Sequence, residues 1–207
     1  SRGLASLLEG YKVFKEFYMR ARIAHIGLGR WGKNILRNLN EMGVVAAACD
    51  QSSELLSQRA QQYPNISFCS DYQDILDNPE IQAVVISTPA STHYTVARAA
   101  ILAGKDVFVE KPLSLRVKDG LELCKLAREH GRILMVGHVL QYHPAVEKLK
   151  SLISTGQLGK IHYLLSNRLN LGALRTEENI LWSFAPHDIS VMLHLFGEYP
   201  AKVSAFG

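Results

Sequence analysis

Three glycines stand in Gly-x-Gly-x-x-Gly spacing within the stretch RIAHIGLGRWG. In a strand-to-helix turn, the first glycine permits a tight turn and the second lets the backbone approach a pyrophosphate. The third lets the helix pack closely on the strand, and the N–H groups that open the helix can bind phosphate. We therefore expect this turn to bind a dinucleotide through Gly27, Leu28, Gly29, Arg30, Trp31 and Gly32.

An aspartate stands 18 residues after the last of these glycines, directly after the apolar segment 44–49. Asp50 can accept hydrogen bonds from the ribose hydroxyls and repels a 2′-phosphate, so it favours NAD over NADP. Arg30 and Lys33 could offset that preference by attracting the phosphate. The alternative interpretation is a tight turn followed by an unrelated surface aspartate.

Two more loops follow apolar runs that have strand character. Thr88 and Pro89 come after AVVI (83–86), and His93 begins the helical pattern that follows. Ligands of open parallel sheets bind beyond the carboxyl ends of the strands, so these three residues are candidate cofactor contacts. His93 fits equally well as a helix N-terminal histidine that is satisfied by the backbone.

A charged pair locked by a proline, Glu110-Lys111-Pro112, ends the strand-like run at 107–109. Pro112 fixes its own φ and favours an extended Lys111, and a cis bond between them would aim the lysine sharply. A lysine beside a nicotinamide ring can hydrogen-bond a substrate hydroxyl and polarise the carbonyl that forms. Glu110 is expected at the same site as a charge partner, and a surface ion pair is the alternative.

The elements that must hold these residues alternate between strand and helix from residue 22 to about 137. Short apolar runs predict strands at 22–26, 44–49, 66–69, 83–86, 107–109 and 134–136. Helical patterns stand between them at 31–42, 53–62, 72–76, 92–103 and 117–130. This rhythm with short links predicts an α/β fold, a Rossmann-type doubly wound parallel sheet with helices on both faces.

The pattern changes after Gly137, where we predict helices at 144–153 and, opened by Pro186, at 187–196. Loosely alternating runs at 161–171 and 202–207 predict strands of a largely antiparallel open sheet. Two strands do not make a self-sufficient sheet, so we expect a truncated α+β domain. The predicted organisation is an N-terminal extension (1–20), a nucleotide-binding domain (21–138) and an incomplete second domain (139–207).

Composition bears on which partners the protein binds and on the cell compartment in which it lies. The 207 residues carry a net charge of +4 without a basic run typical of nucleic-acid binding, and no apolar run is long enough for a bilayer. Residues 1–18 lack a signal-peptide core, and Met19 is expected to lie near a natural start. Cys49, Cys69 and Cys124 lack metal-ligand spacing, which predicts buried free thiols, no metal site and a cytoplasmic protein.

Four stretches resemble the glucose–fructose oxidoreductase / inositol dehydrogenase / MocA family, in unbroken order over roughly residues 20–207. They are GLGRWG, ISTPASTHYTVARAAILAGKDVFVEKPLS, VGHVLQYHPAVEKLK and LWSFAPHDISVMLHLFG. The resemblance implies an NAD(P)-dependent oxidoreductase with a Rossmann domain and a C-terminal domain built on a large open sheet. Relatives commonly form homo-oligomers through that sheet, so we expect the same of the full-length protein.

The resemblance also implies the catalytic residues. Lys111 of Glu-Lys-Pro would bind substrate and act in catalysis, and His187 of APHDI would be the acid/base, a role that suits imidazole. The family often has an acidic residue four positions earlier, where this sequence has Ser183. His187 would then work with Lys111, or with Asp188 as its orienting neighbour.

Substrate contacts implied by the resemblance are Arg168, Asn170, His138, Tyr142 and Asp188. By parity Arg168 and Asn170 share one face of the predicted strand, where an arginine can hold a carboxylate or diphosphate, or simply face solvent. We expect an NAD-dependent dehydrogenase acting on a secondary alcohol of a sugar, cyclitol or nucleotide-sugar. The alternatives are a non-catalytic NAD-binding regulator, and a reductase or dehydrogenase of biliverdin or dihydrodiol type.

Overall fold

The computed structural model describes residues 22–169 and 179–206, and it divides into two units between Val136 and Gly137. Each unit is described by itself. The expected N-terminal extension (1–20) and the candidate residue Asn170 lie outside the described residues.

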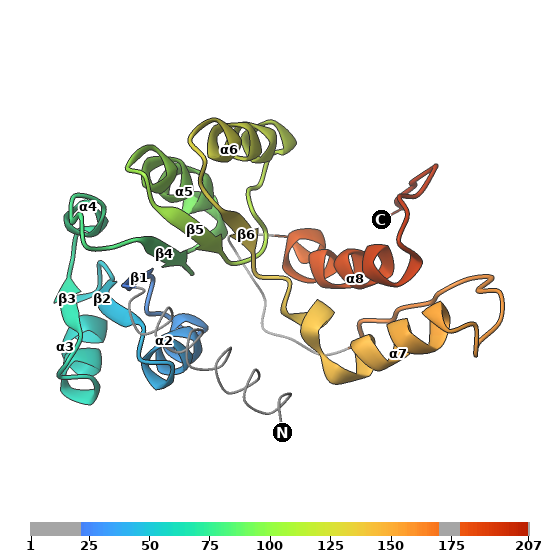
Figure 1. Ribbon diagram of the computed structural model, residues 1–207, viewed down its shortest axis with the longest axis horizontal. Helices are drawn as coiled ribbons and strands as arrows, with labels where there is room; N and C mark the ends of the chain where they lie inside the picture. The colour runs from blue at the N-terminus through green and yellow to red at the C-terminus, as the bar shows by residue number, and fades with distance from the viewer. Residues whose placement is uncertain (1–21, 170–178, 207) are drawn as a thin grey trace, which may run out of the picture. The chain divides into compact units, whose positions relative to one another are not determined.

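The first unit is built on a six-stranded sheet in the order β3-β2-β1-β4-β5-β6, with every neighbouring pair parallel (Figure 1). The strands are β1 (Ile23–Ile26), β2 (Val45–Cys49), β3 (Ser67–Cys69), β4 (Ala83–Ile86), β5 (Asp106–Val109) and β6 (Leu134–Val136). The predicted parallel α/β fold is confirmed. Strand order reverses between β1 and β4, and ligands of such sheets bind at this reversal.

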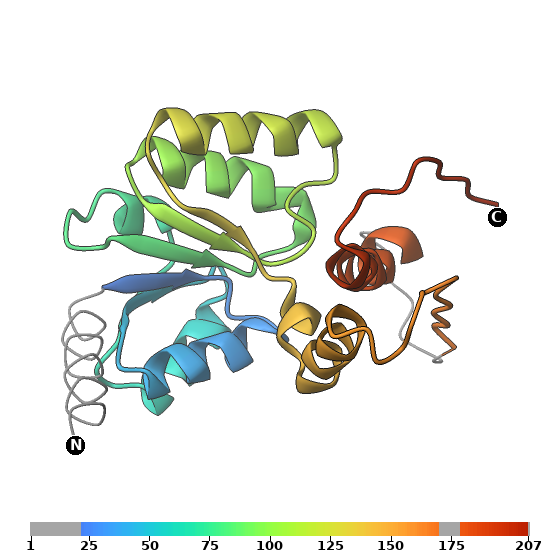
Figure 2. The ribbon, with the colours of Figure 1, turned by 45° about the vertical axis from the view of Figure 1, so that its right-hand side comes forward.

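Helices lie on both faces of the sheet, with α2 and α3 on one face and α5 and α6 on the other (Figure 2). The helices are α2 (Gly32–Glu41), α3 (Ser53–Gln62), α4 (Tyr72–Leu76), α5 (His93–Leu102) and α6 (Val117–Glu129), with a 3-10 turn η1 (Ala90–Thr92) before α5. One core cluster joins Ile26 and Ile86 of the sheet to Ile101 of α5, and a second joins Ala48 to Leu36 of α2. Burial from both sides explains the unbroken apolar strands.

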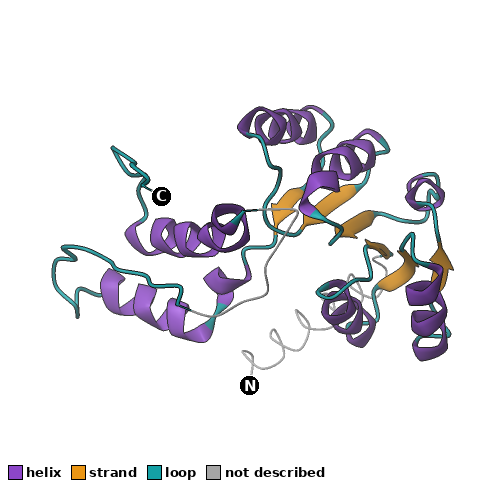
Figure 3. Cartoon of the chain, turned by 180° about the vertical axis from the view of Figure 1, so that it is seen from behind, coloured by secondary structure: helices purple, strands orange, loops and turns teal. Residues whose placement is uncertain are grey.

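The second unit contains a 3-10 turn η2 (Val139–Tyr142) and two helices, α7 (Pro144–Ser154) and α8 (Ile180–Phe196). These elements pack on one another. The Lys150 ammonium donates to the Leu195 carbonyl at 3.1 Å, and the Gln141 amide donates to the Ser190 carbonyl at 3.4 Å. In the part of the chain that is described, all strands belong to the first unit (Figure 3).

The predictions of strands at 161–171 and 202–207 are wrong for the described residues, since 161–169 and 202–206 adopt no regular structure. A strand needs hydrogen-bonding partners, and none of the described residues supplies a neighbouring strand there. The alternating apolar side chains of Tyr163 and Leu165 are accordingly exposed.

Helix α8 begins earlier than predicted. Pro186 lies inside it, and the cap is Asn179, whose side chain accepts a hydrogen bond from the Trp182 N–H at 3.1 Å. Proline in a helix interior costs about 3 kcal/mol, so proline was the expected start. The cap and the apolar residues before Pro186 extend the helix despite that cost.

All three cysteines are free thiols, as predicted, but the prediction that they are buried is wrong for Cys124. Cys49 is buried at the end of β2 and Cys69 is half-buried at the end of β3. Cys124 is exposed on α6, because its position faces solvent rather than the sheet.

Candidate functional site

The glycine turn after β1 is packed so tightly that two of its positions exclude any side chain. Gly27 has φ +99°, and a Cβ there would stand 2.7 Å from the backbone of Ser87 and Thr88. A Cβ on Gly32 would overlap the Gly27 carbonyl oxygen. A Cβ on Gly29 would meet nothing within 4 Å, so this side of the turn is open. The first and third glycines are therefore needed for packing, and the second leaves room for a ligand.

The N-terminus of α2 follows this turn without a side-chain cap. Within the described residues, Trp31 at the capping position makes no capping hydrogen bond, and the first turn of α2 contains no acidic residue. The first N–H groups of a helix lack partners inside the helix and attract anions. The Trp31 indole instead donates to Glu110 Oε1 at 2.9 Å, which joins the glycine turn to the end of β5.

Asp50 lies at the end of β2 and is half-buried. Its carboxylate accepts hydrogen bonds from the N–H groups of Leu28 at 2.6 Å and Ser52 at 2.9 Å. A carboxylate has about four acceptor positions, so both oxygens can accept further hydrogen bonds. The side chain is thus fixed next to the glycine turn while keeping capacity for ribose hydroxyls.

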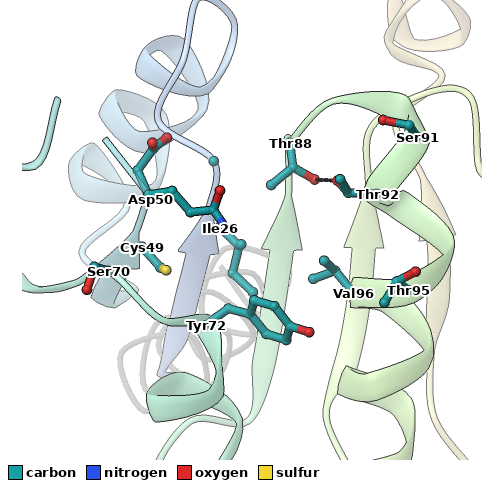
Figure 4. Close-up of a pocket in the computed structure, with 12 residues that line it drawn as sticks. Ile26, Cys49, Asp50, Ser70, Tyr72, Thr88, Ser91, Thr92, Thr95 and Val96 are labelled. Atoms are coloured by element: carbon teal, nitrogen blue, oxygen red, sulfur yellow. Dashed lines mark hydrogen bonds between the residues drawn. The ribbon is translucent and has the colours of Figure 1, made fainter. Parts of the chain in front are cut away.

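A pocket of about 310 Å³ lies between the carboxyl ends of β1, β2 and β4 (Figure 4). Asp50 and Thr88 contribute polar groups to its lining, and Tyr72 of α4 and Val96 of α5 contribute apolar surface. A flat base needs apolar surface and its ribose needs hydrogen-bond partners, so this lining suits an adenosine. Sequence reasoning missed Tyr72 and Val96, because nothing in the motifs marks them.

A chain of hydrogen bonds from β1 holds the glycine turn in place. His25 Nε2 lies 2.8 Å from Ser87 Oγ, which donates to the Gly27 carbonyl at 2.7 Å. Because the hydroxyl hydrogen goes to Gly27, Ser87 Oγ must accept from a hydrogen on His25 Nε2. Burial lowers the pKa of His25 from 6.5 to about 4, despite the nearby Asp50 charge that raises it. His25 is therefore neutral and fixes the glycine turn. Sequence reasoning missed it, although a histidine inside an apolar strand could have indicated a buried polar contact.

The Glu110-Lys111-Pro112 loop is held by hydrogen bonds on both sides of the lysine. The Glu110 N–H donates to the Ile86 carbonyl at 2.9 Å, and the Pro112 carbonyl lies 2.7 Å from His93 Nδ1. The Lys111–Pro112 bond is cis and Lys111 is half-buried. Burial raises the pKa of Glu110, although the Trp31 hydrogen bond and the Lys111 charge oppose that shift.

Thr88 and Pro89 lie in the segment between β4 and α5, and His93 is the first residue of α5, at the same edge of the sheet. Thr88 lines the pocket, and its hydroxyl oxygen accepts a hydrogen bond from the Thr92 hydroxyl at 2.7 Å. Pro89 is exposed. The His93 side chain is buried, and its Nε2 lies 2.9 Å from the Thr88 carbonyl.

In the second unit, three polar side chains form a cluster. The Arg168 guanidinium donates to both oxygens of Asp188, at 2.9 and 3.2 Å, and Ser166 donates to the same carboxylate at 2.7 Å. Burial raises the pKa of Asp188, but the hydrogen bonds from Arg168 and Ser166 outweigh it and hold that pKa below its usual value. The Arg168 guanidinium also lies 5.9 Å from the centre of the Phe184 ring. Arg168 therefore already holds one carboxylate.

The remaining candidates of the second unit lie on α8 and next to η2. Ser183 and His187 stand four residues apart on α8, which places them one helical turn apart, and Ser183 is buried. His138 precedes η2, and burial lowers its pKa. Tyr142, the last residue of η2, is exposed.

Residues 21–138 match an oxidoreductase family that has an NAD-binding Rossmann fold. The match covers more than half of the 207-residue chain. The chain belongs to the Gfo/Idh/MocA oxidoreductase family. In the described part of this family member, no helix is both long and apolar enough to cross a bilayer.

The Gfo/Idh/MocA relatives of this chain include two dehydrogenases. The scyllo-inositol 2-dehydrogenase (NAD(+)) of Bacillus subtilis (strain 168) is 29% identical over 197 residues, which cover 91% of this chain and 57% of that protein. The UDP-N-acetylglucosamine 3-dehydrogenase of Acidithiobacillus ferrooxidans is 30% identical over 187 residues, which cover 90% and 58%. A solved structure, a probable dehydrogenase from Thermotoga maritima, matches with a TM-score of 0.77 at 27% identity, over 86% of this chain and 56% of that one. The chain spans little more than half the length of these relatives.

Two glycine substitutions should separate packing from cofactor binding. We expect Gly29→Val to fold, because the added side chain meets no protein atom near its Cβ, and to weaken NADH binding at least about 30-fold, or about 2 kcal/mol. Gly32→Ala should lower the unfolding temperature, because its Cβ overlaps the Gly27 carbonyl. NADH titration and thermal denaturation measure both effects. Tight NADH binding by Gly29→Val would place the pyrophosphate elsewhere.

Proposed function

We propose that this protein is an NAD-dependent dehydrogenase that transfers a hydride between the nicotinamide and a secondary alcohol or ketone of a sugar, cyclitol or nucleotide-sugar. The observation that carries the proposal is the convergence of three features at one edge of the sheet. The open glycine turn, the fixed Asp50 carboxylate and the Glu110-Lys111-Pro112 loop all follow strands that surround the reversal between β1 and β4.

The proposed roles follow from the chemistry of each group. The bound nicotinamide would accept the hydride at its C4 atom. The Lys111 ammonium would hydrogen-bond the reacting oxygen and stabilise the negative charge that develops there. His187 would take the hydroxyl proton, a role that rests on the family resemblance of the APHDI segment. Ser183 occupies the position of the acidic partner one turn earlier on α8, so Asp188 is the proposed orienting carboxylate.

The proposed substrate class rests on two kinds of support. The relatives include an inositol dehydrogenase and a UDP-N-acetylglucosamine dehydrogenase. The second unit offers an arginine, Arg168, whose guanidinium is partly exposed and shares its carboxylate partner with a serine. An anionic group of a nucleotide-sugar could compete for that guanidinium. We therefore propose a nucleotide-sugar as the first substrate to test.

A substrate panel tests the proposed function. The chain would be mixed with NAD and, in turn, inositols, free sugars and UDP-linked sugars, and NADH formation would be followed by absorbance. We expect reduction of NAD with at least one polyol and the largest rate with a nucleotide-sugar. Binding of NADH without reduction by any member of the panel would contradict the dehydrogenase proposal and favour a non-catalytic NAD-binding regulator.

The preference for NAD over NADP is a separate proposal that rests on Asp50. A carboxylate at this position repels the 2′-phosphate of NADP. We expect Asp50→Ser to reduce the ratio of NADH to NADPH affinity about tenfold or more, with Arg30 and Lys33 then free to attract the phosphate. Parallel titrations with NADH and NADPH measure the ratio, and Asp74→Ser, at an exposed position on α4, is the control. An unchanged ratio in Asp50→Ser would remove Asp50 as the determinant.

A further inference from the structure

One hydrogen bond connects the glycine turn directly to the loop that carries Lys111. The Trp31 indole Nε1 donates to Glu110 Oε1 at 2.9 Å, across 79 residues of sequence. An indole N–H can only donate, so the roles of the two atoms in this bond are fixed. Trp31 follows β1 and Glu110 follows β5, with β4 between these two strands in the sheet. The bond therefore reaches past β4, at the reversal of strand order where ligands of such sheets bind.

Both ends of this hydrogen bond belong to segments that are themselves held in place. Trp31 occupies the capping position of α2, directly before Gly32, which is packed so closely on Gly27 that it admits no side chain. On the other side, the Glu110 N–H donates to the Ile86 carbonyl at 2.9 Å. Burial does not force the bond, because Trp31 is 50% exposed and its indole N–H could donate to water. The indole is thus aimed at the carboxylate by the turn that carries it.

The Glu110 carboxylate also contacts the lysine itself. It accepts a hydrogen bond from the Lys111 backbone N–H, and the Lys111 charge acts on it. Burial raises the pKa of Glu110, and the hydrogen bonds from Trp31 and from the Lys111 N–H oppose this rise because they stabilise the ionised form. One carboxylate therefore accepts from the glycine turn and from the backbone of the lysine.

We propose that Glu110 is a positioning residue for Lys111, and that the Trp31 indole anchors it to the glycine turn. The carboxylate then holds the Lys111 backbone at a fixed place relative to the turn that is proposed to bind the pyrophosphate. The need for this arrangement rests on the proposed function, in which one dinucleotide extends from the turn to the lysine. A displacement of a catalytic group by about 1 Å can lower a rate about 10²-fold.

Kinetics with the best substrate of the panel test the positioning role. We expect Trp31→Phe and Glu110→Leu each to lower kcat about tenfold, while NADH affinity changes less than about threefold because both variants keep the backbone of the turn. The double variant should also lose about tenfold rather than about a hundredfold, since both changes remove the same hydrogen bond. Glu129→Leu, at an exposed position on α6, is the control and should keep the wild-type rate.

A conservative variant separates the hydrogen bond from the mere presence of a side chain. Glu110→Gln keeps an acceptor oxygen for the indole, so it should lose less of kcat than Glu110→Leu, which has none. Equal losses in Glu110→Gln and Glu110→Leu would overturn the positioning role, and so would losses that multiply in the double variant.

A second readout needs no turnover. In the ¹⁵N-lysine-labelled full chain, the backbone amide signal of Lys111 is the one missing from Lys111→Ala, and its change with pH reports the ionisation of Glu110. We expect this titration to vanish in Glu110→Gln and to move to higher pH in Trp31→Phe, because the carboxylate has then lost a donor that stabilises it. An unchanged midpoint in folded Trp31→Phe would overturn the proposal. A wild type that binds NADH but turns over no substrate of the panel would refute the proposed function instead, and the amide titration would still decide whether the indole anchors Glu110.

Discussion

Replacing Lys111 by alanine will lower the turnover of the best substrate by about 10²–10⁴-fold. Backbone hydrogen bonds of Glu110 and Pro112 hold the lysine at the carboxyl end of β5. Its ammonium is the group proposed to stabilise the negative charge that develops on the substrate oxygen. In the proposed function the dinucleotide is bound mainly by the glycine turn and Asp50, so NADH affinity should change less than about threefold. Initial rates and NADH titration on the same preparation measure the two effects.

Matched controls make the Lys111 result specific. Lys118→Ala removes an exposed lysine of α6 and should leave the rate unchanged. His187→Gln should reduce turnover to a similar degree as Lys111→Ala, whereas His194→Gln, in the last turn of the same helix, should not. Equal rates for the wild type and the Lys111 and His187 variants would show that neither residue acts in catalysis.

The chain will lose about 3 kcal/mol of folding stability through His25 as the pH falls from about 6.5 to about 4. Burial lowers the pKa of His25 from 6.5 to about 4 in the folded state. Between these values the unfolded chain binds a proton that the folded chain does not, so acid favours unfolding in this range. Above the unfolded pKa both states are neutral, and the contribution to stability is fully present.

A variant without the titrating ring isolates this effect. His25→Phe keeps a ring of similar size in β1 and cannot take up a proton, while Ser87 still can donate to the Gly27 carbonyl. Urea titrations at a series of pH values give the free energy of unfolding, and the difference between wild type and variant removes the contributions of Glu110 and other carboxylates. We expect this difference to change by about 3 kcal/mol across the range. A constant difference would mean that His25 titrates normally in the folded protein.

The sequence was informative where one physical requirement dominates each residue. Strands buried on both faces must be apolar along their whole length, and this pattern predicted β4 with its observed bounds. The positions of Gly27 and Gly32 exclude every side chain, so their spacing identified the turn. Asp50 and the Glu110-Lys111-Pro112 loop could then be predicted to lie near that turn, because parallel strands end at a common edge of the sheet.

Other features depend on contacts between segments that are distant along the chain, and these could not be predicted. The hydrogen bond from Trp31 to Glu110 spans 79 residues, and the His25 contact with Ser87 spans 62. Helix α8 begins after the Asn179 cap and not at Pro186, where the sequence pattern predicted its start. The strands expected at 161–171 and 202–207 illustrate the same point, since alternation alone does not make a strand without a neighbour.

Hydride transfer itself is the most direct test of the central claim. A secondary alcohol from the substrate panel would carry deuterium on the carbon that loses its hydride, and the reduced cofactor would be analysed by mass spectrometry after reaction with this chain. We predict NADH that contains one deuterium on the nicotinamide ring, with no label when Lys111→Ala is used for the same time. Reduced cofactor without deuterium, or no reduced cofactor with any deuterated alcohol of the panel, would contradict the assignment as an NAD-dependent dehydrogenase.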